Sequence, residues 1–210
     1  MHLYISSYHL GTNASQLSNL VKGEKHVGIV GNALDFSDDL PRVERSLQRE
    51  IDDIKNLGLV PDLLDLRTYF GKQGELKAKL DSLDMLWVIG GNTFILRRAM
   101  AESGFDEILK KYVSNNERPD FVYGGYSAGI CVLPATLKGI DLADDPKFIP
   151  QGYKQQTLWD GLNILPYYFA PHYRSDHEEA DMTEKTVEYY IQEKMLFKAL
   201  RDGEDFFDEV

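Results

Sequence analysis

The pentapeptide GYSAG at residues 125–129 most constrains the fold, because a strand-like run precedes it and an apolar, helix-compatible stretch follows it. A G-x-S-x-G sequence at a strand-to-helix turn is typical of a nucleophile elbow, in which the serine sits in a strained conformation at the tip. The flanking glycines keep the strand and the helix from colliding, and the helix N-terminus offers N–H groups to an oxyanion. The pattern predicts a strand over residues 120–124 and Ser127 as a nucleophile; an ordinary tight turn is the alternative.

Strand-like and helix-like segments alternate along the chain. Short apolar runs at residues 26–30 and 84–89 each end before a glycine, and the apolar residues between them share one helical face. These are Val43, Leu47, Ile51, Ile54 and Leu57. We also expect strands at 63–66 and 196–200, and helices at 75–83 and 92–101. The alternation predicts an α/β fold with a mainly parallel sheet, helices on both faces and ligands at the carboxyl ends of the strands.

Length and charge narrow the function. A chain of 210 residues that is 43% hydrophobic can bury a core as a single domain, residues 1–210. We interpret residues 138–156 as an active-site loop within it. The 23 Lys and Arg are dispersed among 34 acids, and the net charge of −11 argues against nucleic acid as a partner. The sequence shows no signal-peptide pattern and no apolar run that could span a bilayer, and we expect its single cysteine, Cys131, to be buried. We therefore expect a cytoplasmic protein without a membrane partner.

A second glycine turn, GGNT at residues 90–93, precedes an expected helix. Asn92 or Thr93 can cap this helix. If the turn lies beside Ser127, the N–H groups of Gly91 and Ala128 could form an oxyanion hole; the alternative is a helix cap without chemistry. The turn has neither a G-x-G-x-x-G pattern nor a Walker lysine, so no nucleotide cofactor is expected.

A serine nucleophile needs a base, and the chain has five histidines. His172 ends a proline-bounded, strand-like segment at residues 166–173, which would hold it rigidly, as a general base requires. His2 and His26 lie at strand positions, and His9 lies in a loop. His177 follows among acidic residues, but the spacing of this cluster suits no common metal motif, so no metal is expected.

These residues together resemble the peptidase E family of cytoplasmic serine peptidases, which includes alpha-aspartyl dipeptidase and, more distantly, cyanophycinase. The similarity runs through residues 90–94, 125–129, 161–166, 171–173 and 200–203. The resemblance implies a flavodoxin-like fold of the class I glutamine amidotransferase type. It also implies Ser127 as nucleophile, His172 as base, Gly91 and Ala128 as the oxyanion hole, and a homodimer.

The family offers two acids for the third catalytic position. One matches Asp141, in the loop after the elbow helix, and the other matches Asp202, in the late Leu-x-acid-Gly segment. Either carboxylate could hold the tautomer of His172 and stabilise its imidazolium. We favour Asp202, because it follows an expected strand at residues 196–200, whereas Asp141 lies in a polar loop.

The chain departs from the family in two places. Aspartyl dipeptidases carry an arginine near the start of the helix after the histidine cluster, where this chain reads ADMT at residues 180–183. Arg174 could substitute as a substrate clamp, or it could be a surface residue paired to Asp176. The chain also ends soon after Asp202, so we expect part of one sheet edge to be missing or supplied by a partner subunit.

These inferences predict a serine peptidase that hydrolyses small peptides, in the manner of a dipeptidase and with Asp-X peptides as one candidate substrate. Ser127, His172 and an acid would act through an acyl-enzyme, with Asn92 and Arg174 as candidate substrate contacts. Two alternatives stay open: an esterase or amidase with the same nucleophile elbow, and a non-catalytic binding module that retains only its geometry.

Overall fold

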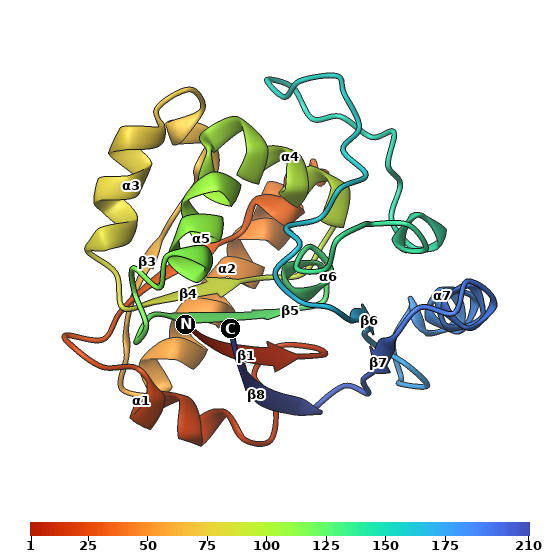
Figure 1. Ribbon diagram of the computed structural model, residues 1–210, viewed down its shortest axis with the longest axis horizontal. Coiled ribbons are helices and arrows are strands. Elements are labelled where there is room, and N and C mark those ends of the chain that lie inside the picture. The colour runs from red at the N-terminus through yellow and green to blue at the C-terminus, as the bar shows by residue number, and fades with distance from the viewer.

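A six-stranded sheet of order β3-β2-β4-β5-β1-β8 lies at the centre of the computed structural model, which describes residues 1–210 (Figure 1). Its strands are β1 (His2–Ser6), β2 (His26–Val30), β3 (Val60–Leu63), β4 (Met85–Val88), β5 (Val122–Tyr126) and β8 (Asp205–Glu209). All neighbours are parallel except β8, which runs antiparallel to β1. The α/β fold with a mainly parallel sheet is therefore confirmed.

The register of the central strands brings the two glycine turns together. Strands β4 and β5 are buried along their whole length, as expected for parallel strands covered on both faces. Val88 pairs with Gly125 at the carboxyl ends of these strands. The chain segments that follow, at Gly90 and at Ser127, therefore leave the same edge of the sheet.

Helices cover both faces of the sheet and enclose two cores. The larger core, of 36 buried residues, lies between the sheet and α3 (Gln73–Asp81), α4 (Thr93–Ser103), α5 (Phe105–Ser114) and α6 (Ala128–Cys131). The smaller core, of 13 buried residues, lies on the other face beneath α1 (Leu17–Leu20) and α2 (Leu40–Asn56). Four 3-10 helices occupy connecting segments: η1 (Ala14–Gln16), η2 (Asn32–Leu34), η3 (Leu66–Tyr69) and η4 (Ile140–Leu142).

Helix α2 confirms the helix predicted from the apolar spacing. It begins where the side chain of Asp39 accepts a hydrogen bond from the N–H of Arg42, and Pro41 lies in its first turn. Gly58 follows its end with a φ of 75°, a conformation that favours glycine. Ile54 is fully buried, and so is the charged residue Glu50.

A small substructure lies beyond one end of the main sheet (Figure 1). It contains the parallel pair β6 (Tyr168–Ala170) and β7 (Phe197–Ala199), together with α7 (Ala180–Gln192). The strand expected at residues 166–173 is thus only Tyr168–Ala170, because the prolines at both ends limit its ladder. The pairing of β6 with β7 places the residues after each strand side by side, which include His172 and Asp202.

One expectation needs correction. The strand expected at residues 63–66 is β3 at Val60–Leu63, because Asp65 caps the 3-10 helix that begins at Leu66. Residues 205–209 form β8, which pairs with β1 and is the edge strand on that side of the sheet. The first and last residues meet, with the N-terminal amine of Met1 2.8 Å from the carbonyl oxygen of Val210.

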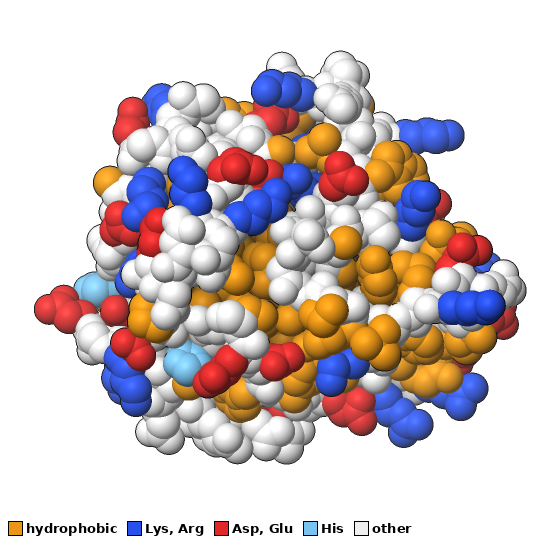
Figure 2. Space-filling view, viewed as in Figure 1, with side chains coloured by type: hydrophobic (Ala, Val, Ile, Leu, Met, Phe, Trp, Pro, Cys, Tyr) orange, Lys and Arg blue, Asp and Glu red, His pale blue; other side chains and the backbone are white.

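The charged side chains are intermingled on the face shown in Figure 2, where basic and acidic groups lie next to one another. No basic stripe crosses this face, which agrees with the dispersed charges of the sequence. None of the helices combines the length and the hydropathy that crossing a bilayer requires.

Candidate active site

Ser127 lies at the turn between β5 and α6 in a conformation that non-glycine residues rarely adopt. Its φ is 47° and its ψ is −116°, so the backbone is strained at this point. The residue is 8% exposed, and its hydroxyl makes no hydrogen bond to the protein. The strained turn therefore presents a free hydroxyl at the carboxyl edge of the sheet, as the nucleophile-elbow pattern predicts.

The two glycines of the pentapeptide are explained by a close approach of backbone to backbone. A Cβ added at Gly129 would lie 2.1 Å from the carbonyl oxygen of Val88, and one added at Gly125 would lie 2.8 Å from the same oxygen. Real Cβ atoms do not approach a backbone oxygen so closely, and neither β4 nor α6 can move without disturbing the core. Glycine is required so that α6 can pack against the end of β4.

Replacing Gly129 by alanine is expected to destabilise the protein by about 1–3 kcal/mol, because overpacking must push α6 away from β4. The free energy of unfolding from urea denaturation measures this loss. Gly74 is a matched control: it lies exposed in α3 with nothing within 4 Å of its added Cβ, so Gly74→Ala should be neutral or stabilising. Equal stability of the two variants would contradict the packing argument.

Gly91 has a φ of 136°, which is available to glycine but strained for other residues. Its N–H donates to no acceptor in the protein. The N–H of Ala128 is at the first position of α6, where a helix has no acceptor of its own. One predicted oxyanion donor thus lies on the turn between β4 and α4, and the other lies directly after Ser127 on the turn between β5 and α6. Both turns leave the same edge of the sheet.

The position of Gly91 depends on 3-10 helix η2. The carbonyl oxygen of Ala33 accepts a hydrogen bond of 2.8 Å from the N–H of Asn92, and a Cβ on Gly91 would lie 2.4 Å from that oxygen. Contact with η2 therefore requires glycine at position 91. The hydrogen bond from the N–H of Asn92 to Ala33 also fixes the orientation of the backbone at Gly91.

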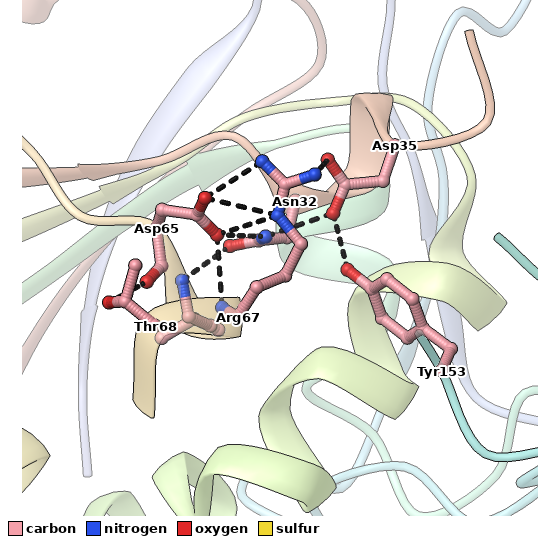
Figure 3. A network of polar contacts seen from close by, with 7 residues as sticks. Asn32, Asp35, Asp65, Arg67, Thr68 and Tyr153 are labelled. Atoms are coloured by element: carbon pink, nitrogen blue, oxygen red, sulfur yellow. Dashed lines mark hydrogen bonds and ion pairs between the residues drawn. The ribbon is translucent and has the colours of Figure 1, made fainter. Parts of the chain in front are cut away.

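A polar network holds η2 in place (Figure 3). The amide nitrogen of Asn32 donates to Asp35 at 3.0 Å and to Asp65 at 2.9 Å. Arg67 bridges the same two carboxylates, 3.3 Å from Asp35 and 2.7 Å from Asp65. The hydroxyl of Tyr153, from the loop at residues 138–156, also donates to Asp35. The network therefore ties this loop and η3 to the segment that positions Gly91.

His172 is buried, at 1% exposure, and its Nδ1 lies 2.7 Å from the carboxylate of Asp202. Ser7, directly after β1, connects the two residues: its Oγ donates to Asp202 at 3.0 Å and accepts from the backbone N–H of His172 at 2.8 Å. The Asp202 N–H donates to Ser175 Oγ at 2.8 Å. These bonds fix the imidazole with Nδ1 toward the acid, so Nε2 is left free to exchange a proton.

The surroundings of His172 favour its neutral form. Burial and the neighbouring His177 lower the pKa of His172 below its ordinary value, while Asp202 acts in the opposite direction. The rings of His172 and His177 stack with centroids 3.7 Å apart and planes 7° apart, and Tyr8 packs edge-on against both. A neutral imidazole at neutral pH is the form that a general base needs.

Asp141 lies elsewhere. It is exposed on η4, and its carboxylate accepts a hydrogen bond of 2.9 Å from the N–H of Gly139; it makes none to His172. The acid of this loop that approaches the site is Asp144, whose carboxylate accepts from the N–H of Thr93 at 2.8 Å. Burial raises the pKa of Asp144 to about 6. Of the two expected acids, the structure brings only Asp202 into contact with the imidazole.

The two expected substrate contacts have structural partners. The side chain of Asn92 caps α4 by accepting from the N–H of Ile95, and it donates to the carbonyl of Asp145. Arg174 is exposed and donates to Glu184 at 2.8 Å, so the surface alternative describes it better, although its partner is Glu184 and not Asp176. Neither side chain lines the cavity beside Ser127.

A buried carboxylate lies beneath the site. Glu50 of α2 is completely buried and accepts hydrogen bonds from Trp87 at 2.8 Å and Tyr126 at 3.0 Å, with His9 Nδ1 2.7 Å away. Burial alone would raise the pKa of Glu50, but these hydrogen bonds outweigh it and leave the pKa below its usual value. The carboxylate therefore anchors the residue that precedes Ser127.

A cavity of about 150 Å³ opens beside Ser127 and His172. Tyr8 and Tyr126 line it, Arg42 and Arg49 of α2 contribute one wall, and Glu178 and Glu179 before α7 contribute another. Burial, followed by the acids Asp144, Glu178 and Asp202, raises the pKa of Glu179 to about 7. The sequence pattern did not reveal these residues, because they lie on segments far from the glycine motifs and carry no motif of their own.

The side-chain ligand atoms of His172, His177 and Asp202 lie within 4.8 Å of one another. The two rings are parallel, so their nitrogens do not converge on one point, and Nδ1 of His172 already contacts Asp202. We therefore assign no metal to this group. The expectation that Cys131 is buried is confirmed; burial raises the pKa of its thiol well above the ordinary value, so it is unsuited to act as a second nucleophile.

A parallel sheet with helices on both faces and a strained serine at a strand-to-helix turn defines an α/β protein of the flavodoxin-like class. Residues 18–205 match the model of peptidase family S51, and the chain belongs to that family. It is 27% identical over 144 residues to an uncharacterised peptidase of Listeria monocytogenes, which covers 69% of this chain and 65% of the relative. It is 30% identical over 130 residues to peptidase E of Streptomyces coelicolor, which covers 62% and 51%.

The fold also matches a solved structure. A crystal structure of a candidate peptidase E from Listeria monocytogenes superposes with a TM-score of 0.77 over 99% of this chain and 94% of that chain, at 23% identity. In the sequence alignments, by contrast, the match spans about two thirds of the first curated relative and about half of the second.

Proposed function

We propose that this protein is a serine peptidase that hydrolyses small peptides through an acyl-enzyme on Ser127. The observation that carries the proposal is the buried His172, which lines the same cavity as the strained Ser127 and whose Nδ1 lies 2.7 Å from the carboxylate of Asp202. Membership of peptidase family S51 supports the reaction class. The cavity volume of about 150 Å³ is small compared with pockets for drug-sized ligands, which favours short substrates.

In the proposed mechanism, His172 Nε2 takes the proton of Ser127 as Oγ attacks the substrate carbonyl carbon. The N–H groups of Gly91 and Ala128 stabilise the tetrahedral oxyanion. The imidazolium, stabilised by Asp202, then gives its proton to the leaving amine as the peptide bond breaks. Water attacks the acyl-enzyme in the second half, with His172 again as base, and the serine hydroxyl is restored. Because Ser127 and His172 share no hydrogen bond in this structure, we expect their contact to tighten when substrate binds.

The proposal is tested by two measurements on the folded protein. A serine-reactive phosphonate should label Ser127, and dipeptides or short acyl-peptides in a panel should be hydrolysed. Cleavage of simple esters by a protein that cleaves no peptide of the panel would support the esterase alternative. A folded protein that neither reacts with the phosphonate nor cleaves any substrate would support the binding module. Asp-X peptides belong in the panel, because the acidic preference stays a prediction.

The pH dependence of Ser127 labelling tests the environment of the base. Because the pKa of His172 lies below its ordinary 6.5, labelling should persist below pH 6.5 and fall only as pH drops through that lower pKa. His177→Phe keeps a stacking ring but removes a titratable neighbour, so the pKa should rise and the acid limb should move to higher pH. An unchanged limb would show that burial alone sets the pKa of His172.

A further inference from the structure

Glu50 is a charged residue whose presence the packing of α2 does not explain. It is completely buried, and a buried carboxylate costs free energy unless hydrogen bonds compensate it. An apolar side chain of similar size is often as stabilising in such a position. Glu50 does not line the cavity beside Ser127, so contact with a substrate does not explain it either. The reason for a carboxylate here lies in the groups that it binds.

The three groups that bind this carboxylate come from three adjacent strands, in the order β4, β5 and β1. Trp87 lies in β4, Tyr126 is the last residue of β5, and His9 lies in the loop after β1. Their side-chain nitrogen or oxygen atoms lie 2.8, 3.0 and 2.7 Å from the carboxylate of Glu50. One side chain of α2 therefore joins three strands of the sheet.

Each of these strands leads into one part of the proposed catalytic apparatus. Gly91 lies on the turn after β4, and Ser127 directly follows β5. Ser7 directly follows β1 and connects the base to its acid by two hydrogen bonds. The nucleophile, one oxyanion donor and the residue that holds the base to the acid therefore all follow strands that Glu50 joins.

Tyr126 is the donor closest to the chemistry, because its backbone leads directly into Ser127. Its ring packs on the neighbouring glycine turn: a Cβ added at Gly90 would lie 2.8 Å from Cε2 of Tyr126 and 3.0 Å from Cβ of Ser127. Tyr8 packs edge-on against the Tyr126 ring and also against His172, with centroids 5.8 and 5.4 Å apart. The hydrogen bond from the Tyr126 hydroxyl to the buried carboxylate fixes the end of this ring, and with it the spacing of the two turns.

The charge of Glu50 fixes the direction of these bonds. Burial acts to raise its pKa, but the hydrogen bonds from His9, Trp87 and Tyr126 outweigh burial and leave the pKa below its usual value. A carboxylate only accepts hydrogen bonds, so all three partners must donate. A glutamine has one accepting oxygen and one donating NH₂ group, so it keeps the shape of Glu50 but cannot accept from all three.

We propose that Glu50 is a positioning residue of the active site, which binds the hydroxyl of Tyr126 and so holds Ser127 and the turn at Gly91 at the spacing that acyl transfer requires. Glu50 contacts neither the substrate nor the reacting atoms, and it acts through the ring of Tyr126. This inference rests on the proposed function, in which Ser127 is the nucleophile. It explains why α2 carries a buried carboxylate at this position.

Tyr126→Phe is the first test, because it keeps the ring and removes only the hydroxyl. The second-order rate constant for phosphonate labelling of Ser127 should fall about 10- to 100-fold, since a misplacement of reacting groups by about 1 Å costs a factor of this order. In peptide hydrolysis kcat should fall by a similar factor. KM should change by less than about twofold, because the ring that lines the cavity is retained.

Tyr112→Phe is the matched control. Tyr112 of α5 is buried like Tyr126, and its hydroxyl donates to the carboxylate of Asp81, the last residue of α3, at 2.8 Å. This variant also loses a hydrogen bond from a tyrosine to a carboxylate, but Tyr112 does not line the cavity beside Ser127. It should lower the free energy of unfolding without changing the labelling rate. Urea denaturation identifies conditions in which both variants are folded, and labelling is compared there.

Glu50→Gln tests the other partner of the bond. It should lower the labelling rate by a factor similar to that of Tyr126→Phe, because the carboxylate acts through the hydroxyl. The double variant should then lose little more than either single variant. Losses that multiply in the double variant would show that the two residues act independently, and would overturn the proposal.

The outcomes separate this inference from the proposed function. A wild-type labelling rate in Tyr126→Phe, or an equal loss in Tyr126→Phe and Tyr112→Phe, would overturn the positioning role while leaving a peptidase in place. A wild-type protein whose Ser127 is labelled but which cleaves no peptide would overturn the peptidase function, and the labelling comparison would still decide the positioning role. Tyr126→Phe leaves the buried charge in place, so it decides the question even if Glu50→Gln fails to fold.

Discussion

Ser127→Ala is expected to lower kcat for peptide hydrolysis by at least about 10⁴-fold, because the other serines that line the cavity, Ser37 and Ser46, lie in α2 and just before it and not at the strained turn. Labelling by phosphonate should disappear completely. The free energy of unfolding should change by no more than about 0.5 kcal/mol, because the hydroxyl makes no hydrogen bond and alanine meets the same backbone strain. Rates are measured with the best peptide of the panel, and intact-protein mass spectrometry measures labelling.

Ser114→Ala is a suitable control for the serine experiment, since Ser114 is exposed at the end of α5, on the chain before β5. It should keep wild-type rates and labelling. If Ser127→Ala retained wild-type hydrolysis, the acyl-enzyme on this residue would be excluded, whatever the geometry of the turn.

The second large effect is expected for Asp202→Asn. An asparagine can offer an N–H to Nδ1 of His172 and so favour the wrong tautomer, and it cannot stabilise the imidazolium; the loss in kcat should be about 10³- to 10⁴-fold. Stability should fall less than activity, because the amide oxygen can still accept the hydrogen bond from Ser7. Steady-state kinetics and urea denaturation of the same preparations measure the two effects.

Asp141→Asn is the matched comparison, because sequence similarity offers Asp141 for the same role. Its carboxylate bonds only to the N–H of Gly139 on the exposed η4, so we expect kcat within about threefold of wild type. A large loss in Asp141→Asn together with full activity in Asp202→Asn would assign the orienting role to the loop acid. Equal activity of both variants would remove both acids from the mechanism.

Local patterns predicted much of the fold and of the site. Hydrophobic periodicity identified each segment as a strand or a helix, because the spacing of apolar residues reflects which face of the element is buried. The alternation of strands and helices along the chain then predicted a parallel sheet with helices on both faces. The pentapeptide at residues 125–129 predicted the strained Ser127. Its two glycines are needed because a Cβ at either position would clash with the carbonyl oxygen of Val88. His172 was predicted from the proline-bounded segment at residues 166–173, and the structure places it two residues after β6.

Elements with weaker local signals were placed less well. The residues at 63–66 look like a strand in isolation, but Asp65 and Asn32 bond to the segment that follows β3 and turn it into a 3-10 helix. The segment at residues 166–173 pairs with β7, which lies almost thirty residues later, and does not join the main sheet. Pairing between distant segments leaves no periodic trace in either one.

The sequence by itself determined the class of fold, the serine turn and the histidine, because each depends on residues that are neighbours in the chain. Only the tertiary structure decided which acid meets that histidine, since Asp202 reaches it through the pairing of β6 with β7. Only the tertiary structure, likewise, showed the charged walls of the cavity. Helix α2 and the segment before α7 line the same cavity, although more than a hundred residues separate them in the sequence. Side chains brought together by distant segments are set by packing of the whole core, and no local pattern records them.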